Sequence, residues 1–499
     1  MTISLHPKFL HRIREFIWPI KRQECHFFIP MALIMTCALY NFACLRAVKD
    51  SLIVSNVGAE SISFLKLWFV LPAAIIFTLF YLNLSNKYTI DKVFYIITTG
   101  FLLFFLVFTL YILPNKNLLH PPTENIEKLV AYYPNFKWFL KIAGHWTFAI
   151  MYILSELWSV VVINLMFWQF ANNVVDASKA KRFYPIFGVV GNFGLIIAGN
   201  NLIYFAKVEE APTFLSGLGL YALQFNEDIG IKLAILSVIF SGVLMLLLML
   251  YLNITVLKDT NIDNKITKIK TKLSLADSLK LVLSSSYVGY ITALIICYGL
   301  AINILEGPWK ASIKEYYKTQ EDYMAFMGVF NVFMGISCVL FMIIGSNILR
   351  IFSWTTSALF TPVVIGITGV AFFIFVIISR LGSDFLWFHP LFGAILAGAI
   401  QNILSKSSKY SLFDSTKEMA YIPLPPELKT KGKAAAEVIG AKFGKSVGAV
   451  IQSFMFTFLP NCNFYDLTPV LLSIFLLVIM FWYYNVMKLA KDYEEIASK

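Results

Sequence analysis

Long apolar stretches recur along the whole chain, separated by short polar segments. A helix that crosses a bilayer needs about 20 largely apolar residues, and twelve windows meet that length. They are 27–54, 61–84, 93–113, 138–172, 183–206, 229–254, 286–310, 322–347, 354–378, 386–406, 434–460 and 466–487. The window 138–172 is either one long tilted helix or two helices, and two would invert the sidedness of every later segment. The pattern predicts an all-α polytopic membrane protein of about twelve spans.

Composition agrees with this pattern and excludes a soluble enzyme. Hydrophobic residues make up 58% of the 499 residues and charged residues 14%, with a mean hydropathy of +0.72, whereas soluble domains carry roughly a quarter charged residues. The first apolar run is too long for the core of a signal peptide, so we expect it to stay as an anchor. Before it, Phe9, Ile13 and Phe16 share one face of a basic segment, which predicts an amphipathic helix on the membrane surface over 1–26.

The net charge of +12 is distributed unevenly between the two sides of the membrane. With both termini on one side, 26 of the 41 lysines and arginines fall on that side and 8 on the other, when Lys406 and Lys310, which end their windows, are counted with the adjoining segments. Cytoplasmic loops carry the excess of such residues, so both termini are expected in the cytoplasm. The excess of positive charge is therefore a topology signal, and nucleic-acid binding is not expected.

Six spans, a basic segment and six more spans suggest two parallel halves, as in major-facilitator-like transporters. Leu45-Arg46 in the first span and Leu305-Glu306 in the seventh occupy similar places, and a lysine follows each pair, at Lys49 and Lys310. The expected organisation is a cytoplasmic amphipathic segment (1–26), a first six-helix bundle (27–254), a basic cytoplasmic linker (255–285), a second six-helix bundle (286–487) and a cytoplasmic tail (488–499).

Several ionisable residues lie deep within the predicted spans, where each is costly and needs a partner or a polar pathway. The cations are Arg46, Lys49, Lys66, Lys442 and Lys445, and the acids are Glu156 and Glu306. These charges either form ion pairs that hold helices together or line a central substrate path. Five cations against two acids would leave positive charge stranded in a low dielectric, so the surplus favours a polyanionic substrate. Lysine and arginine both suit phosphate groups.

Other sequence patterns exclude some classes of membrane protein without identifying one. Several aromatic residues follow the two acids and are candidates to stack on a base: Trp158, Phe167, Trp168 and Phe170 after Glu156, and Trp309 after Glu306. Gly444-Lys445-Ser446 resembles the end of a phosphate-binding loop, but the full pattern needs glycine at position 439, which is Ile439, so no ATPase is expected. Scattered histidines and cysteines predict neither a metal nor a cofactor. Transport driven by gradients or exchange remains, with a membrane-embedded transferase as the weaker alternative.

A set of short motifs, spread over nearly the whole chain, resembles the ATP/ADP translocases of obligate intracellular bacteria and plastids, and the rickettsial carriers above all. The motifs are Leu45-Arg46-Ala47-Val48-Lys49-Asp50, Phe64-Leu65-Lys66, Ser155-Glu156-Leu157-Trp158, Lys181-Arg182-Phe183-Tyr184-Pro185, Asn303-Ile304-Leu305-Glu306-Gly307-Pro308-Trp309-Lys310, Gln401-Asn402-Ile403-Leu404-Ser405-Lys406, Lys409-Tyr410-Ser411-Leu412-Phe413-Asp414, Met419-Ala420-Tyr421-Ile422-Pro423-Leu424, Lys431-Gly432-Lys433-Ala434-Ala435 and Gly444-Lys445-Ser446.

The resemblance implies a carrier rather than an enzyme, which exchanges external host ATP for internal ADP without hydrolysis. It implies functional charges at Lys66, Glu156, Glu306 and Lys445, which the cost of buried charge had already selected; Arg46 and Lys49 join them as supporting cations. The motifs leave open a proton-coupled or exchange uptake of GTP, CTP or UTP. We expect a protein of the bacterial inner membrane that contacts lipid and works as a monomer.

Overall fold

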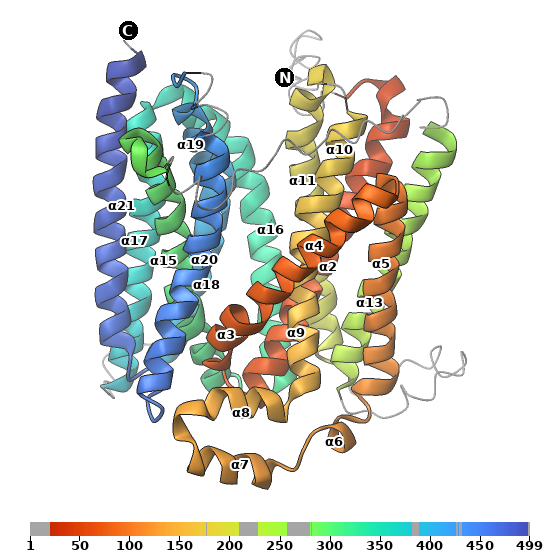
Figure 1. Ribbon diagram of the computed structural model, residues 1–499, viewed down its shortest axis with the longest axis vertical. Coiled ribbons are helices and arrows are strands. Elements are labelled where there is room, and N and C mark those ends of the chain that lie inside the picture. The colour runs from red at the N-terminus through yellow and green to blue at the C-terminus, as the bar shows by residue number, and fades with distance from the viewer. Residues whose placement is uncertain are drawn as a thin grey trace, which may run out of the picture.

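The computed structural model describes residues 20–175, 177–208, 228–256, 280, 282–381, 389–425, 428 and 432–497. All secondary structure in these ranges is helical. The prediction of an all-α membrane protein is therefore confirmed, and Figure 1 shows its helices running mostly along one common direction.

We call η1 to η7 the first half and α15 to α21 the second half. The first half comprises η1 (Arg22–Glu24), α2 (Cys25–Asn56), α3 (Ser61–Phe64), η2 (Leu65–Val70), α4 (Leu71–Lys87), α5 (Ile90–Val107), η3 (Phe108–Ile112), α6 (Lys116–Leu119), α7 (Thr123–Tyr132), η4 (Pro134–Phe136), α8 (Lys137–Gly144), α9 (Trp146–Trp158), η5 (Ser159–Phe167), α10 (Trp168–Val174), α11 (Ala177–Phe205), α13 (Ile229–Tyr251) and η7 (Leu252–Val256). The second half comprises α15 (Ser286–Tyr316), α16 (Gln320–Ile351), α17 (Trp354–Arg380), α18 (Pro390–Ser408), η8 (Lys409–Phe413), α19 (Asp414–Ala420), α20 (Lys433–Phe458) and α21 (Thr468–Ala497).

Ten helices within the described ranges are long and apolar enough to cross a membrane. Two further helices, α18 and α20, have 19 and 26 residues and occupy the tenth and eleventh predicted windows. Their sequences are more polar, as Gln401, Asn402 and Lys406 of α18 illustrate. In the second half α18 packs against α17 and α15, and α20 packs against α15 (Figure 1), so polar side chains can face other helices instead of lipid.

The long window 138–172 contains one span, not two. Helix α8 ends at Gly144, and a new helix starts at Trp146 and continues through η5 and α10 to Val174. In Figure 1, α8 runs across the end of the bundle together with α7, while α9 turns into it. The sidedness inferred for the later spans is therefore unchanged.

The two halves pack closely along α11 and α16. A side chain at Gly199 would place its Cβ 2.5 Å from the carbonyl oxygen of Gly328, and one at Gly328 would lie 2.7 Å from the oxygen of Gly199. Only glycine allows the two backbones to approach in this way. Because both positions are glycine, α11 of the first half rests directly on α16 of the second.

Further contacts between the halves lie at the end of the bundle that carries α6, α7 and α8, which we call the loop end. There Ser51 donates to the carbonyl oxygen of Gln320 at 3.0 Å, and Trp138 packs against Phe456 at 6.2 Å between ring centroids. At the opposite end, where the described chain begins and ends, α4 and α20 diverge (Figure 1). We call this the terminal end. The halves are thus closed at the loop end.

Two predicted segments fall mostly outside the described residues. Residues 1–19 of the amphipathic segment and most of the basic linker 255–285 belong to this part of the chain. The amphipathic helix, the linker and the exact bounds of the two bundles remain predictions.

Candidate functional site

Three charged residues of α2 are buried in the middle of the protein. Arg46 is 6% exposed, Lys49 3% and Asp50 0%. Arg46 and Lys49 are three residues apart and Arg46 and Asp50 four, so all three project from one side of the helix. Burial of this kind is unfavourable unless every charge has a partner.

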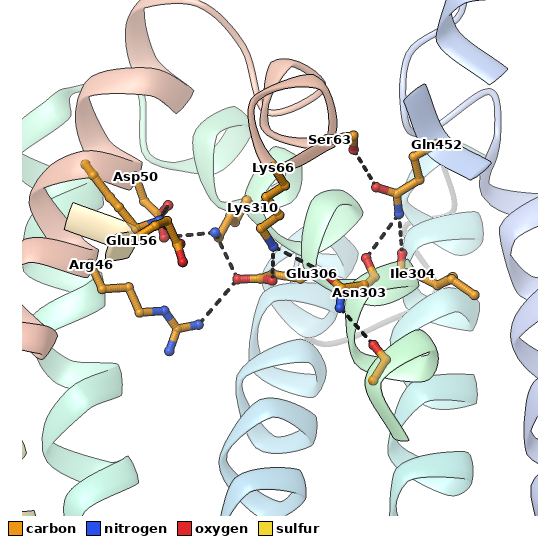
Figure 2. A network of polar contacts seen from close by, with 12 residues as sticks. Arg46, Asp50, Ser63, Lys66, Glu156, Asn303, Ile304, Glu306, Lys310 and Gln452 are labelled. Atoms are coloured by element: carbon orange, nitrogen blue, oxygen red, sulfur yellow. Dashed lines mark hydrogen bonds and ion pairs between the residues drawn. The ribbon is translucent and has the colours of Figure 1, made fainter. Parts of the chain in front are cut away.

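The partners of α2 come from α15 in the second half. Glu306 and Lys310 lie one helical turn apart, and Lys310 Nζ contacts Glu306 Oε1 at 3.0 Å. The same ammonium contacts Asp50 Oδ2 at 2.9 Å, with both side chains almost fully buried. Lys49 Nζ lies 2.8 Å from the other oxygen of Asp50. A continuous chain of opposite charges therefore connects the two halves (Figure 2).

Lys66 joins this network from a π-helical turn, η2. Its Nζ donates to Glu306 Oε2 at 2.7 Å and to Asn303 Oδ1 at 3.3 Å. In this turn the N–H of Leu71 donates to the carbonyl oxygen of Lys66, and Pro72, which has no N–H to donate, follows directly. Single π turns of this type are frequent at functional sites. Here the turn orients Lys66 toward the second half.

Glu156 and Arg46 complete the network, and neither is fully satisfied by it. Glu156 Oε1 accepts an ion pair from Lys49 at 2.9 Å, but its side chain is 29% exposed. Arg46 Nη2 lies 3.6 Å from Glu306 Oε1, while its Nη1 is buried without a hydrogen-bond partner. The Arg46 guanidinium also lies 5.4 Å from the ring centre of Phe330 in α16. Both residues can therefore accept a further polar group.

A second contact beside the network depends on Pro308 inside α15. Proline has no N–H, so the carbonyl oxygen four residues earlier, on Ile304, loses its helical donor. Gln452 of α20 supplies one, with Nε2 donating to Ile304 O at 3.2 Å and to Asn303 O at 3.1 Å. The Oε1 of Gln452 in turn accepts from Ser63 Oγ of α3 at 2.7 Å. Figure 2 shows this bridge beside Lys66 and Glu306.

Five of the six residues selected from the sequence meet in this network: Arg46, Lys49, Lys66, Glu156 and Glu306. The sixth, Lys445, lies on α20, and its side chain is outside the described part of the structure, as is that of Lys442. The backbone there is placed: the ideal Cβ position of Gly299 in α15 lies 2.7 Å from the carbonyl carbon of Gly444. Residue 445 is thus next to α15, two turns before Glu306.

Sequence reasoning missed two members of the network, Asp50 and Lys310. The seventh predicted window ends at Lys310 itself, whereas α15 continues to Tyr316 and buries that lysine. A signal was available in the spacing of four residues between Glu306 and Lys310. With both included, the network contains four cations and three carboxylates among the described residues, a smaller surplus than five cations against two acids.

Two of the tryptophans considered for base stacking are core residues. Trp158 and Trp309 are both 0% exposed. Trp158 packs edge-on against Phe101, and Trp309 donates its indole N–H to the carbonyl oxygen of Ile395 at 3.0 Å. Neither ring has a free face, so that prediction is wrong for both.

Comparison with known proteins identifies the family. A model of the TLC ATP/ADP transporters matches residues 4–493. The chain belongs to the TLC ATP/ADP transporter family. This membership confirms the resemblance drawn from the short motifs and makes the protein a multi-pass membrane transporter.

Rickettsial relatives of this TLC-family chain match it from end to end. It is 55% identical to "ADP,ATP carrier protein 3" of Rickettsia bellii (strain RML369-C) over 99% of this chain and 100% of that protein. It is 53% identical to the protein of the same name from Rickettsia prowazekii (strain Madrid E), again over 99% and 100%. Identity to "ADP,ATP carrier protein 1" of Rickettsia bellii is 42%, over 100% of this chain and 99% of the relative.

Solved structures support the fold of this TLC-family chain. A bacterial homologue of the iron transporter ferroportin in an inward-facing state matches with a TM-score of 0.53 at 14% identity, over 94% of this chain and 100% of that one. The inward-open xylose transporter XylE of E. coli matches with a TM-score of 0.54 at 12% identity, over 91% and 94%. At this identity the likeness concerns the fold alone, and it agrees with the predicted major-facilitator-like architecture.

Proposed function

We propose that this protein exchanges external ATP for internal ADP by alternating access, without hydrolysis. The observation that carries the proposal is the buried ion-pair network between α2, η2 and α15, in a chain of the TLC ATP/ADP transporter family. Its surplus cation is suited to a polyanion, and its ion pairs cross from one half to the other. The network therefore combines a place for phosphate with the contacts that hold the loop end closed.

Phosphate would enter the network by replacing Glu306. Lys66 and Arg46 both point at this one carboxylate, at 2.7 and 3.6 Å, and a nucleotide phosphate offers more charge and more oxygen acceptors than a carboxylate does. Lys66 would contact phosphate from the first half and Lys445 from the second, with Arg46 and Lys49 as supporting cations. Glu156 and Glu306 would take these cations back when the site is empty.

The same contacts give a physical reason for exchange. Opening the loop end separates Lys310 from Asp50 and Lys66 from Glu306, and an isolated buried charge costs several kcal/mol. A bound phosphate provides a substitute partner for the released cations, so the loaded carrier reorients faster than the empty one. A carrier that returns only when loaded is an exchanger.

We further propose that the terminal end faces the cytoplasm of a bacterial inner membrane. The excess of lysine and arginine on that side supports this orientation. Host ATP would then reach the network when the loop end opens, and ADP would leave by the same route. The division into bundles over 27–254 and 286–487, and function as a monomer, belong to the same proposal.

Counterflow in proteoliposomes tests the function. Vesicles that contain the purified protein are preloaded with ADP or left empty, and the uptake of labelled ATP, GTP, CTP and UTP is measured with and without a proton gradient. We expect ATP uptake that requires internal ADP and that the gradient leaves unchanged. Uptake into empty vesicles driven by protons, or a preference for GTP, CTP or UTP, would overturn the proposal.

Variants of the network test the phosphate role. Lys66→Ala should abolish uptake while the protein still inserts into the membrane, and Lys445→Ala should do the same. Lys87→Ala is a matched control, because Lys87 ends α4 and is exposed. Normal exchange by Lys66→Ala would remove Lys66 from the site.

A further inference from the structure

Lys406 of α18 is a further cation, on the side of the network that faces the terminal end, and it forms no ion pair with the residues that the structure describes. The tenth predicted window ends at this residue, but the helical backbone continues through η8 and α19 to Ala420. Lys406 is partly exposed, and no carboxylate of a described residue lies within 4.0 Å of its Nζ. An unpaired ammonium inside a bundle of membrane helices is costly, so its position needs an explanation.

The surroundings of Lys406 connect it to the network. Its Nζ lies 6.0 Å from the ring centre of Phe42 in α2, and Phe42 is one helical turn from Arg46 on the same side of that helix. Arg46 also has the buried, unpartnered Nη1 on its guanidinium. Two incompletely neutralised cations therefore lie near each other.

Tyr410 lies one turn after Lys406, toward the terminal end. Its side chain is 53% exposed, and Lys409 Nζ lies 5.0 Å from the ring centre. Because Lys406 and Tyr410 are four residues apart on a continuous helical backbone, they project from the same side of it, and on that side the Lys406 ammonium lies over Phe42 of the first half. Tyr410 is an aromatic surface next to a cation, which is the combination that a nucleotide base and its adjacent phosphate require.

We propose that Lys406 and Tyr410 form a second subsite that binds the nucleoside monophosphate part of the substrate. This inference rests on the proposed function. Lys406, with the free side of Arg46, takes the phosphate next to the ribose, and Tyr410 contacts the base. The terminal phosphate then points toward Lys66 and Glu306. Phe42, beside Lys406, and Arg46, beside Glu306, are about one helical turn or roughly 5 Å apart along α2, a distance that a di- or triphosphate chain spans.

The order of contacts makes a distinct prediction for affinity. ATP and ADP share the inner phosphate and the base, so loss of Lys406 should weaken both to the same extent. Lys66→Arg, which keeps the positive charge but changes its position at the terminal phosphate, should change the ratio between them. A lysine that only supports the fold would alter neither the affinity of the folded protein nor this ratio.

Competition against labelled ADP in counterflow measures these affinities, with ATP, ADP and inorganic tripolyphosphate as competitors. Lys406→Gln should raise the half-inhibitory concentrations of ATP and ADP by about tenfold each, as for the loss of one hydrogen bond to a charged group, and Lys406→Arg should restore them. Tyr410→Leu should weaken both nucleotides about fivefold or more and leave tripolyphosphate unchanged.

Helix α21 offers matched controls. Tyr484 is also 53% exposed, and Lys488 Nζ lies 5.5 Å from its ring centre, on the outside of the second half (Figure 1). Tyr484→Leu and Lys488→Gln should behave as wild type. If Lys406→Gln does not fold, Lys406→Met, which keeps the aliphatic stem against Phe42, is measured instead.

The outcomes separate the two levels of the proposal. No ADP-dependent ATP uptake by the wild-type protein would refute the proposed function itself. Normal exchange by the wild type, with Lys406 and Tyr410 variants indistinguishable from the α21 controls, would refute the second subsite alone. A change in the ATP-to-ADP ratio with Lys406→Gln would place Lys406 at the terminal phosphate and contradict the order proposed here.

Discussion

Lys310 of α15 and Asp50 of α2 form an ion pair of 2.9 Å in which the side chains are 1% and 0% exposed. Each belongs to a different half, and each has a second charged neighbour: Glu306 for Lys310 and Lys49 for Asp50. The pair is therefore the most buried link between the halves among the described ion pairs, and its loss should affect both stability and transport.

Removing either partner of this pair should be strongly destabilising. Removing both should reduce the free energy of unfolding by less than the sum of the two single losses. Asp50→Asn or Lys310→Met alone leaves a buried charge without its main partner, which costs about 3–5 kcal/mol. The double variant Asp50→Asn/Lys310→Met removes both charges. Thermal unfolding of the four proteins in detergent gives the coupling energy. Additive losses would show that the two residues do not interact in the folded protein.

Pro308 and Gln452 should be energetically coupled through the Ile304 carbonyl group. Gln452→Met leaves that oxygen unsatisfied and should cost about 1–3 kcal/mol. In a Pro308→Ala background the N–H of residue 308 can donate to Ile304, so the same Gln452→Met change should cost less. The measurement is again unfolding of the single and double variants. Equal costs in both backgrounds would mean that Gln452 does not replace the missing donor.

The glycine pair between α11 and α16 should tolerate no side chain. Gly328→Ala places a Cβ 2.7 Å from the carbonyl oxygen of Gly199, so the two halves must separate locally and the melting temperature should fall. Gly100→Ala is the matched control, because nothing lies within 4 Å of its Cβ position and alanine favours a helix over glycine by about 1 kcal/mol. The prediction fails if both variants melt alike.

Stability should decrease in acid because of His120, which lies in the connection between α6 and α7. Burial, followed by repulsion from His145 and Lys116, lowers the pKa of His120 to about 4; its Nε2 lies 2.6 Å from Thr147 Oγ1. The unfolded chain has the ordinary higher pKa, so it binds more protons between about pH 6.5 and 4, and stability is lost as the pH falls through that window.

His120→Gln should flatten this dependence. Melting temperatures of the wild type and variant, measured from pH 7.5 to 4, test the assignment. His26→Gln is a suitable control, since His26 is exposed in α2 and should leave the slope intact. An unchanged slope in His120→Gln would assign the acid sensitivity to other groups.

The sequence predicted the spans well because hydrophobic length is a local property, and the deep charges because their cost does not depend on the partner. The predictions from the sequence failed for residues at the ends of the predicted spans. Lys310 and Lys406 end their apolar windows, but the helical backbone continues past both, so only the structure shows them between packed helices. The buried state of Trp158 and Trp309 was equally hidden, because an aromatic residue has the same local pattern in a core and in a binding site.

The sequence also could not show which charged residues form ion pairs with one another. Glu306 is contacted by Lys66, Lys310 and Arg46, residues up to 260 positions away along the chain. Which of these cations meets which acid depends on how α2 and η2 approach α15. That approach follows from packing of the two halves, and no spacing within a single helix encodes it.

The π-helical turn around Lys66 sets the direction of that side chain through the number of residues it contains. A π turn holds one more residue than an α turn, so removing a single residue from Leu67–Val70 would rotate Lys66 by about 100° relative to α4. The lysine would then leave Glu306 while its own identity stayed the same. The contact between Lys66 and Glu306 therefore depends on the length of the helix turn as well as on the two charges. A shortened turn would break this contact without changing any charged residue.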